Sequence, residues 1–137
     1  MDIPKNILFV CVENAGRSQM AEAFFKKFAK TRFNVTSAGT SPSSNLNPVV
    51  VSVMAEIGID LHAQQPQLLS SSMIENSIKT VNMGCVDKES CPSLFVKDVD
   101  DRNVEDPKGK SIEDVRKIRD QIKNDVLNLL DSLQNDI

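Results

Sequence analysis

The chain has 137 residues, 40% hydrophobic and 26% charged, and this composition is typical of one globular domain with its own core. A formal net charge of −3, with scattered lysines and arginines, does not indicate a nucleic-acid partner. No apolar run has the length of a membrane span, and no signal peptide is recognisable. We therefore expect a single cytoplasmic domain over residues 1–137, with no membrane partner.

The first predicted element is a strand at residues 6–12, where apolar and β-branched side chains follow one another without a break. A helix is predicted at residues 18–30, because its apolar residues recur at helical spacing. These residues are Met20, Ala21, Phe24, Phe25 and Phe28. A short strand at residues 33–37 then leads into a turn.

A second helix is predicted after Asn47, which has the character of a cap, with Pro48 at the first helical position. Gly58 is expected to end this helix. Its predicted apolar face holds Val49, Val50, Val53, Met54 and Ile57. A short helix is also predicted within residues 65–77.

Two further strands are predicted at residues 78–83 and 94–99. Ser111 is expected to cap the last helix, with Asp114 at the capping-box position. The apolar stripe of that helix is Ile112, Val115, Ile118, Ile122, Val126, Leu129, Leu130 and Leu133. Since strands alternate with helices, we predict a parallel α/β sheet covered on both faces, with a ligand site at the carboxyl edge, where Cys11 lies.

The segment "CVENAGRS" at residues 11–18 joins the first strand to the first helix. A tight loop at a helix N-terminus turns backbone N–H groups inward and so favours an oxyanion. Arg17 adds a planar fork for two oxygens, and Gly16 permits a backbone that a side chain would hinder. The same positive surroundings favour a thiolate on Cys11, to which Ser18 can donate while also capping the helix.

Two residues of this loop need their own explanation. Glu13 is unfavourable beside an anion unless its carboxylate points outward, whereas Asn14 can brace the loop by side-chain hydrogen bonds. The predicted oxyanion-binding residues are Val12, Glu13, Asn14, Ala15, Gly16, Arg17 and Ser18. The alternative is a buried structural cysteine with a surface arginine.

Asp106-Pro107 stands in a predicted loop far downstream. A phosphate-type ester needs its leaving oxygen protonated, and a carboxylic acid on a loop can supply that proton. The competing interpretation is a simple Asp-Pro turn before a helix. His62 is expected on a surface loop, without a role.

These segments resemble the low-molecular-weight protein tyrosine phosphatase superfamily, in its Cys-x5-Arg-Ser loop and in "EDP" for the general-acid loop. The resemblance implies a three-layer α/β/α fold with a four-stranded parallel sheet. Within it, "VNMGCVDKESCP", "SQMAEAF" and "DPKGKS" are similar to the thioredoxin-coupled arsenate reductases. The sequence departs from some of them in having Gly16 where they carry another cysteine, and no aromatic residue shortly before Asp106.

The resemblance implies that Cys11 attacks arsenate, that Cys85 then attacks Cys11 and releases arsenite, and that Cys91 resolves the resulting disulfide. Thioredoxin would reduce the final Cys85–Cys91 disulfide. Phosphate or sulfate would mimic arsenate in the loop. No cofactor is implied, and a monomer is expected.

Other interpretations of the cysteine pair remain open from sequence. The ligand spacing does not favour a zinc site. Cys85 and Cys91 can also be inert thiols, or a redox pair that protects Cys11 of a phosphatase from oxidation. A phosphomonoester hydrolase is thus the second hypothesis, and a non-enzymatic oxyanion or thiol sensor is the third. The absence of tyrosine weighs against the phosphatase.

Overall fold

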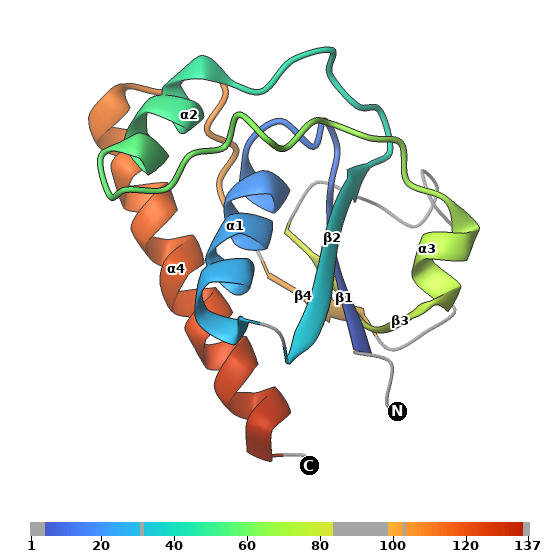
Figure 1. Cartoon of the computed structure of the whole chain (residues 1–137). Coiled ribbons are helices and arrows are strands. Elements are labelled where there is room, and N and C mark those ends of the chain that lie inside the picture. Colours follow the sequence, from blue (N-terminus) through green and yellow to red (C-terminus); the bar gives the residue numbers. More distant parts are fainter. Residues whose placement is uncertain (1–4, 31, 84–98, 103, 136–137) are drawn as a thin grey trace.

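Four parallel strands form one sheet in the order β2-β1-β3-β4 (Figure 1). The structure is a computed structural model, and it describes residues 5–30, 32–83, 99–102 and 104–135. The strands are β1 (Lys5–Cys11), β2 (Phe33–Gly39), β3 (Ser77–Asn82) and β4 (Val99–Asp101). The predicted four-stranded parallel sheet is confirmed.

Helices cover both faces of this sheet, as predicted. They are α1 (Arg17–Ala29), α2 (Pro48–Ala55), α3 (Ser71–Glu75) and α4 (Ile112–Asn135). On one face α1 contacts β1 and β2, and α4 packs against both α1 and α2. The short helix α3 contacts β3 and lies on the opposite side of the sheet (Figure 1). The three-layer arrangement follows from these contacts.

The central strand β1 is buried on both faces. Its residues Ile7, Phe9 and Cys11 belong to the large core beneath α1, α2 and α4. Leu8 and Val10 alternate with them and join the smaller core on the α3 side. This period of two follows from the pleat of a strand, and it directs Cys11 toward the same layer as α1.

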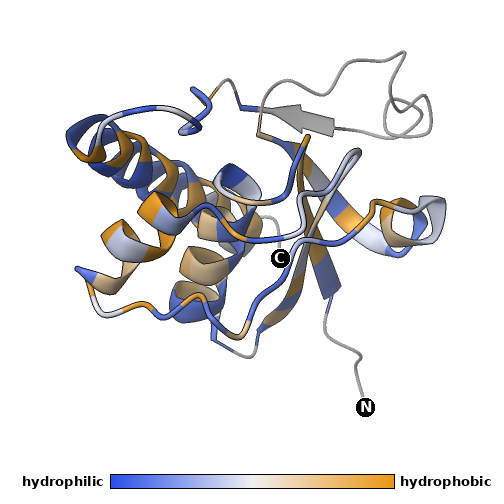
Figure 2. Cartoon of the chain, turned by 90° about the horizontal axis from the view of Figure 1, so that it is seen from above, coloured by the Kyte–Doolittle hydropathy of each residue, from blue (hydrophilic) through white to orange (hydrophobic). Residues whose placement is uncertain are grey.

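The helix α4 presents an apolar face to α1 and α2 and a hydrophilic face outward (Figure 2). Its buried residues are Val115, Ile118, Ile122, Val126, Leu129 and Leu130. Ser111 Oγ accepts a hydrogen bond from Asp114 N at 3.2 Å, which confirms the predicted cap. The prediction was wrong for Ile112, the first residue of the helix, which is 42% exposed.

Two predicted boundaries differ from the structure. Asn47 caps α2 through Val49 N as expected, but the helix ends at Ala55 rather than at Gly58. Ile57 is consequently 37% exposed and is not part of the buried face. The predicted strand at residues 94–99 overlaps β4 only at its last residue, and residues 94–98 lie outside the described part of the chain.

Within the described residues, no helix is both long enough and apolar enough to cross a membrane.

Candidate active site

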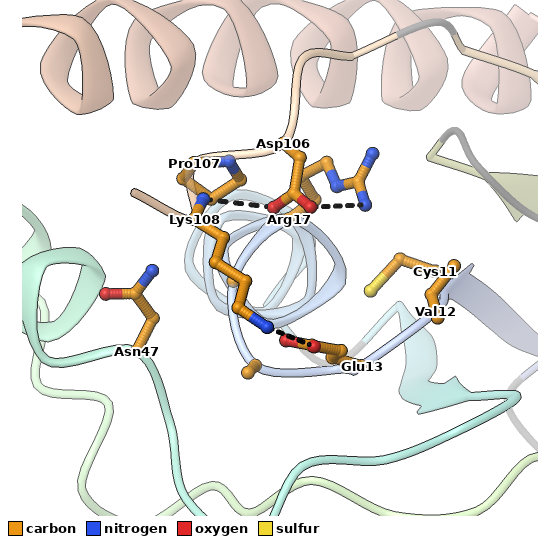
Figure 3. A pocket seen from close by; sticks show the side chains of 10 residues that line it. Cys11, Val12, Glu13, Arg17, Asn47, Asp106, Pro107 and Lys108 are labelled. Atoms are coloured by element: carbon orange, nitrogen blue, oxygen red, sulfur yellow. Dashed lines mark hydrogen bonds and ion pairs between the residues drawn. The ribbon is translucent and has the colours of Figure 1, made fainter. Parts of the chain in front are cut away.

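The loop at residues 11–18, called here the Cys11 loop, leaves β1 at the carboxyl edge of the sheet and enters α1. It faces the loop at residues 104–111, called here the Asp106 loop. A pocket of about 150 Å³ lies between the two loops (Figure 3). Its lining residues are Cys11, Val12, Glu13, Ala15, Gly16, Arg17, Asn47, Asp106, Pro107 and Lys108. The structure thus brings Cys11, Arg17 and Asp106 together.

Cys11 is only 2% exposed, and two groups of its own loop contact the sulfur. Asn14 N donates to Sγ at 3.2 Å, and Ser18 Oγ lies 2.8 Å from Sγ. Since Asn14 Nδ2 already donates to Ser18 Oγ at 2.6 Å, the hydroxyl hydrogen of Ser18 is available for the sulfur. Two donors directed at one sulfur are the arrangement that a thiolate accepts. The predicted contact between Ser18 and Cys11 is confirmed.

The expectation that Ser18 caps the helix was wrong. Helix α1 begins at Arg17, with Gly16 in the cap position and no side-chain cap. Ser18 is the second helical residue, and its hydroxyl serves Cys11 instead. A Cβ at Gly16 would approach Pro107 Cγ to 2.9 Å. The need for glycine at this position therefore comes from the close approach of the Asp106 loop.

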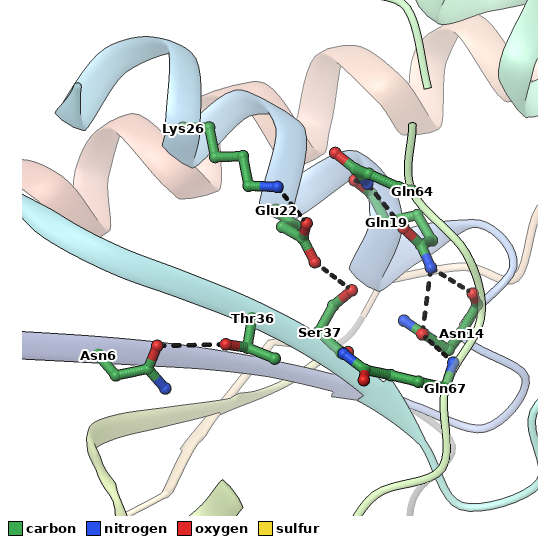
Figure 4. Close-up of polar contacts among 9 residues, drawn as sticks. All are labelled: Asn6, Asn14, Gln19, Glu22, Lys26, Thr36, Ser37, Gln64 and Gln67. Atoms are coloured by element: carbon green, nitrogen blue, oxygen red, sulfur yellow. Dashed lines mark hydrogen bonds and ion pairs between the residues drawn. The ribbon is translucent and has the colours of Figure 1, made fainter. Parts of the chain in front are cut away.

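Asn14 braces the Cys11 loop from below, as predicted. It is fully buried and adopts a positive φ of 52°. Its Oδ1 accepts hydrogen bonds from Gln19 Nε2 at 3.1 Å and from Gln67 N at 2.9 Å (Figure 4). Gln64 in turn donates to Gln19 Oε1 at 2.6 Å. Asparagine tolerates this backbone conformation better than most residues, and its side chain locks it.

The three glutamines of this amide network were not identified from sequence. Gln19 stands next to Ser18 in the first turn of α1 and is fully buried, while Gln64 and Gln67 come from the segment that precedes α3. A polar residue among the apolar residues of a helix is the one sequence signal that could have pointed to Gln19.

Arg17 connects the two loops. Its side chain is only 4% exposed, and one terminal nitrogen donates to Val104 O at 3.0 Å. The other terminal nitrogen lies 3.8 Å from Asp106 Oδ2. A guanidinium held in this way presents a fixed positive charge beside the pocket.

Asp106 belongs to the more exposed wall of the pocket. Its side chain is 52% exposed, and Oδ1 accepts a hydrogen bond from Lys108 N at 3.0 Å. The Lys108 ammonium reaches across and pairs with Glu13 Oε1 at 2.9 Å (Figure 3). Glu13 lines the pocket, but its carboxylate is partly exposed and is paired with this ammonium. The hydrogen bond that Lys108 donates to Glu13 raises the pKa of Lys108 above its usual value.

The remaining sequence expectations concern Cys85, Cys91 and His62. Cys85 and Cys91 lie outside the described residues. His62 is 78% exposed and pairs with Asp60, in agreement with its expected surface position. Among the residues that the structure describes, no group of three histidine, cysteine or carboxylate side chains could hold a metal ion.

The site combines a cysteine at the end of a buried parallel strand, an arginine at the start of the following helix and a carboxylate on a facing loop. This combination defines a phosphatase-type α/β protein. In agreement, residues 6–137 match the low molecular weight phosphotyrosine protein phosphatase family. The chain belongs to this family.

Individual relatives differ in their named activities. The chain is 36% identical over 121 residues to an arsenate reductase of Staphylococcus aureus strain Newman, covering 87% of this chain and 91% of that protein. It superposes with a TM-score of 0.82 and 31% identity on a thioredoxin-dependent arsenate reductase of Corynebacterium glutamicum, covering 98% of this chain but 64% of that one. It superposes with a TM-score of 0.84 and 27% identity on an arginine phosphatase of Geobacillus stearothermophilus, covering 97% and 95%.

Proposed function

We propose that this protein reduces arsenate to arsenite, with Cys11, Cys85 and Cys91 as the thiols of a relay. The observation that carries the proposal is the pocket between the Cys11 loop and the Asp106 loop. It measures about 150 Å³, and none of its described lining residues is aromatic. A pocket of this kind suits a bare tetrahedral oxyanion better than the ring of a phosphotyrosine.

In the first step, the Cys11 thiolate attacks arsenic and forms a sulfur–arsenic bond. Arg17 and the backbone N–H groups of residues 12–18 hold the remaining oxygens. One hydroxide leaves arsenic and takes the proton of Asp106, so it departs as water. The contacts of Ser18 and Asn14 with the sulfur keep the nucleophile oriented before the attack.

In the second step, the Cys85 thiolate attacks the sulfur of Cys11. A disulfide forms, and the electron pair of the sulfur–arsenic bond moves onto arsenic, which leaves as arsenite. Two electrons therefore pass from two thiols to one arsenic. Cys91 then attacks Cys85, which frees Cys11 and leaves a Cys85–Cys91 disulfide for an external dithiol.

The comparisons support this chemistry through the relatives named as arsenate reductases. One of these structures is described as thioredoxin-dependent, so we propose thioredoxin as the external dithiol. A relay of free thiols requires a reducing compartment, and for this reason we place the reaction in the cytoplasm. We propose that the chain works as a single-domain monomer.

Two variants test the relay in a single-turnover arsenite assay without added thiol. Cys85→Ser is expected to release no arsenite, because nothing can displace it from Cys11. Cys91→Ser is expected to release up to one arsenite per protein and to stop as a Cys11–Cys85 disulfide, detectable by mass mapping. Stoichiometric arsenite from Cys85→Ser, or normal turnover of Cys91→Ser with thioredoxin, would contradict the relay.

A second candidate function is the hydrolysis of phosphomonoesters. It is favoured by the half-exposed position of Asp106 at the pocket, where it could protonate a leaving alcohol. This activity would need Cys11, Arg17 and Asp106 but neither downstream cysteine. Full aryl phosphatase activity in Cys85→Ser, together with no arsenate turnover by the unmodified protein with thioredoxin, would make hydrolysis the main function.

A further inference from the structure

Besides the contact of Arg17 with Asp106, a second ion pair joins the two walls of the pocket. Lys108 Nζ lies 2.9 Å from Glu13 Oε1, and the two residues are 95 positions apart in sequence. We propose that Glu13 and Lys108 form a latch that positions Asp106 over the Cys11 sulfur. The proposal rests on the function above, because it concerns the residue that donates the proton.

The backbone links the latch directly to the acid. Lys108 N donates to Asp106 Oδ1 at 3.0 Å, so the residue that holds Glu13 also orients the Asp106 carboxylate. The second carboxylate oxygen faces Arg17 at 3.8 Å. Asp106 is therefore held between Arg17 on one side and Lys108 on the other (Figure 3).

Beyond the contacts of Arg17 with Val104 O and Asp106, the described residues of the Asp106 loop have few other restraints. Between residues 104 and 111, only Val104 and Pro107 are buried, and Gly109 turns the chain with a positive φ of 75°. Pro107 rests against Gly16, where a Cβ would come within 2.9 Å of its ring. Because Gly16 has no side chain, Pro107 can pack closely against it. The ion pair with Glu13 then fixes Lys108, the residue that follows Pro107.

The latch also accounts for a carboxylate in a loop that is built for anions. Glu13 is 41% exposed on its side chain, and the Lys108 ammonium neutralises it. The hydrogen bond that Lys108 donates to Glu13 raises the pKa of Lys108, so the ammonium stays charged well above neutral pH. Glu13 and Lys108 are positioning residues here, since they act on the substrate through Asp106.

The kinetic test uses two probes, phenyl phosphate and p-nitrophenyl phosphate. The first leaving group needs protonation and the second needs little. Glu13→Gln and Lys108→Met are each expected to lower kcat for phenyl phosphate by about two- to fivefold, the range for an exposed ion pair. KM and the rate with p-nitrophenyl phosphate should hardly change. The double variant should lose no more than either single variant, because both remove one interaction.

Lys110→Met is the matched control. Lys110 lies in the same loop and also forms an ion pair, at 2.6 Å, but with Glu105 rather than with the Cys11 loop. This variant should behave like the unmodified protein. An equal loss in Lys110→Met, or additive losses in the double variant, would overturn the latch.

Hydrogen exchange measured by mass spectrometry tests the latch without any activity. Glu13→Gln should speed exchange in the peptide that spans residues 104–110, while a peptide from β1 stays unchanged. Unchanged exchange at 104–110 would overturn the latch and leave the proposed function intact. Asp106→Asn separates the two ideas: if it slows both probes equally, Asp106 is not the acid and the latch fails, whereas the thiol relay fails only if the Cys85→Ser or Cys91→Ser outcome contradicts it.

Discussion

The two walls of the pocket are held in different ways. In the Cys11 loop, Cys11, Asn14, Arg17 and Ser18 are all buried, and side-chain hydrogen bonds reach each of them. In the Asp106 loop, the acid is 52% exposed, and the loop is held by Arg17, by two buried apolar residues and by an exposed ion pair. The nucleophile Cys11 is thus part of the buried core, whereas the acid Asp106 lies on an exposed loop beside that core.

This difference implies that substitutions in the two loops affect different properties of the protein. Changes in the Cys11 loop disturb buried polar groups, which are costly to leave unpaired. Changes in the Asp106 loop disturb contacts that water can replace, so they should alter the rate with little effect on stability. Substitutions on each wall test this contrast.

The largest effect is expected from Cys11→Ser. A hydroxyl is barely ionised where a thiolate would be, so both arsenate reduction and aryl phosphate hydrolysis should fall by more than about 10³-fold. The folded state should persist, because serine fits the space of the thiol. Thermal unfolding checks the fold, and steady-state assays with each substrate check the activity. Turnover of either substrate above a tenth of the original rate would refute the role of Cys11.

Arg17→Lys should follow in size. Lysine keeps the charge but cannot contact Val104 O, Asp106 and an oxyanion with one planar group. We expect a loss of about 2–4 kcal/mol in transition-state stabilisation, by analogy with the removal of an oxyanion donor. The measurement is kcat/KM, and Arg32→Lys, at an exposed position, is the control. An unchanged kcat/KM would show that the guanidinium fork is dispensable.

Asn14→Ala should affect stability more than chemistry. It removes the amide that donates to Ser18 and accepts from Gln19 and Gln67, so Gln67 N loses its acceptor and the buried Ser18 hydroxyl loses a donor. A loss of about 1–3 kcal/mol in the free energy of unfolding is expected. Urea denaturation measures it, with Asn45→Ala, at an exposed position, as the control expected within about 0.5 kcal/mol. Equal losses in the two variants would mean that the amide network does not stabilise the loop.

The wall made by the Cys11 loop was largely predictable from sequence. Cys11, Gly16, Arg17 and Ser18 stand within eight consecutive residues between a strand and a helix, so their proximity is local. The prediction that Ser18 caps the helix was wrong. A serine near a helix start looks the same in sequence whether its hydroxyl caps the helix or contacts a neighbouring sulfur. Asp106 was identified by resemblance and chemistry, but its distance from Arg17 was not predictable.

The helices and strands, their alternation and the sheet edge at which Cys11 lies all follow from sequence. Period, β-branching and caps are local properties, and the parallel sheet follows from them. Three contacts between distant residues are visible only in the folded chain. Pro107 packs against Gly16, Lys108 pairs with Glu13, and Gln67 N donates to Asn14, 53 residues away. Such contacts depend on how the loops pack over the edge of the folded sheet. A loop has no sequence periodicity that predicts which distant loop it will contact.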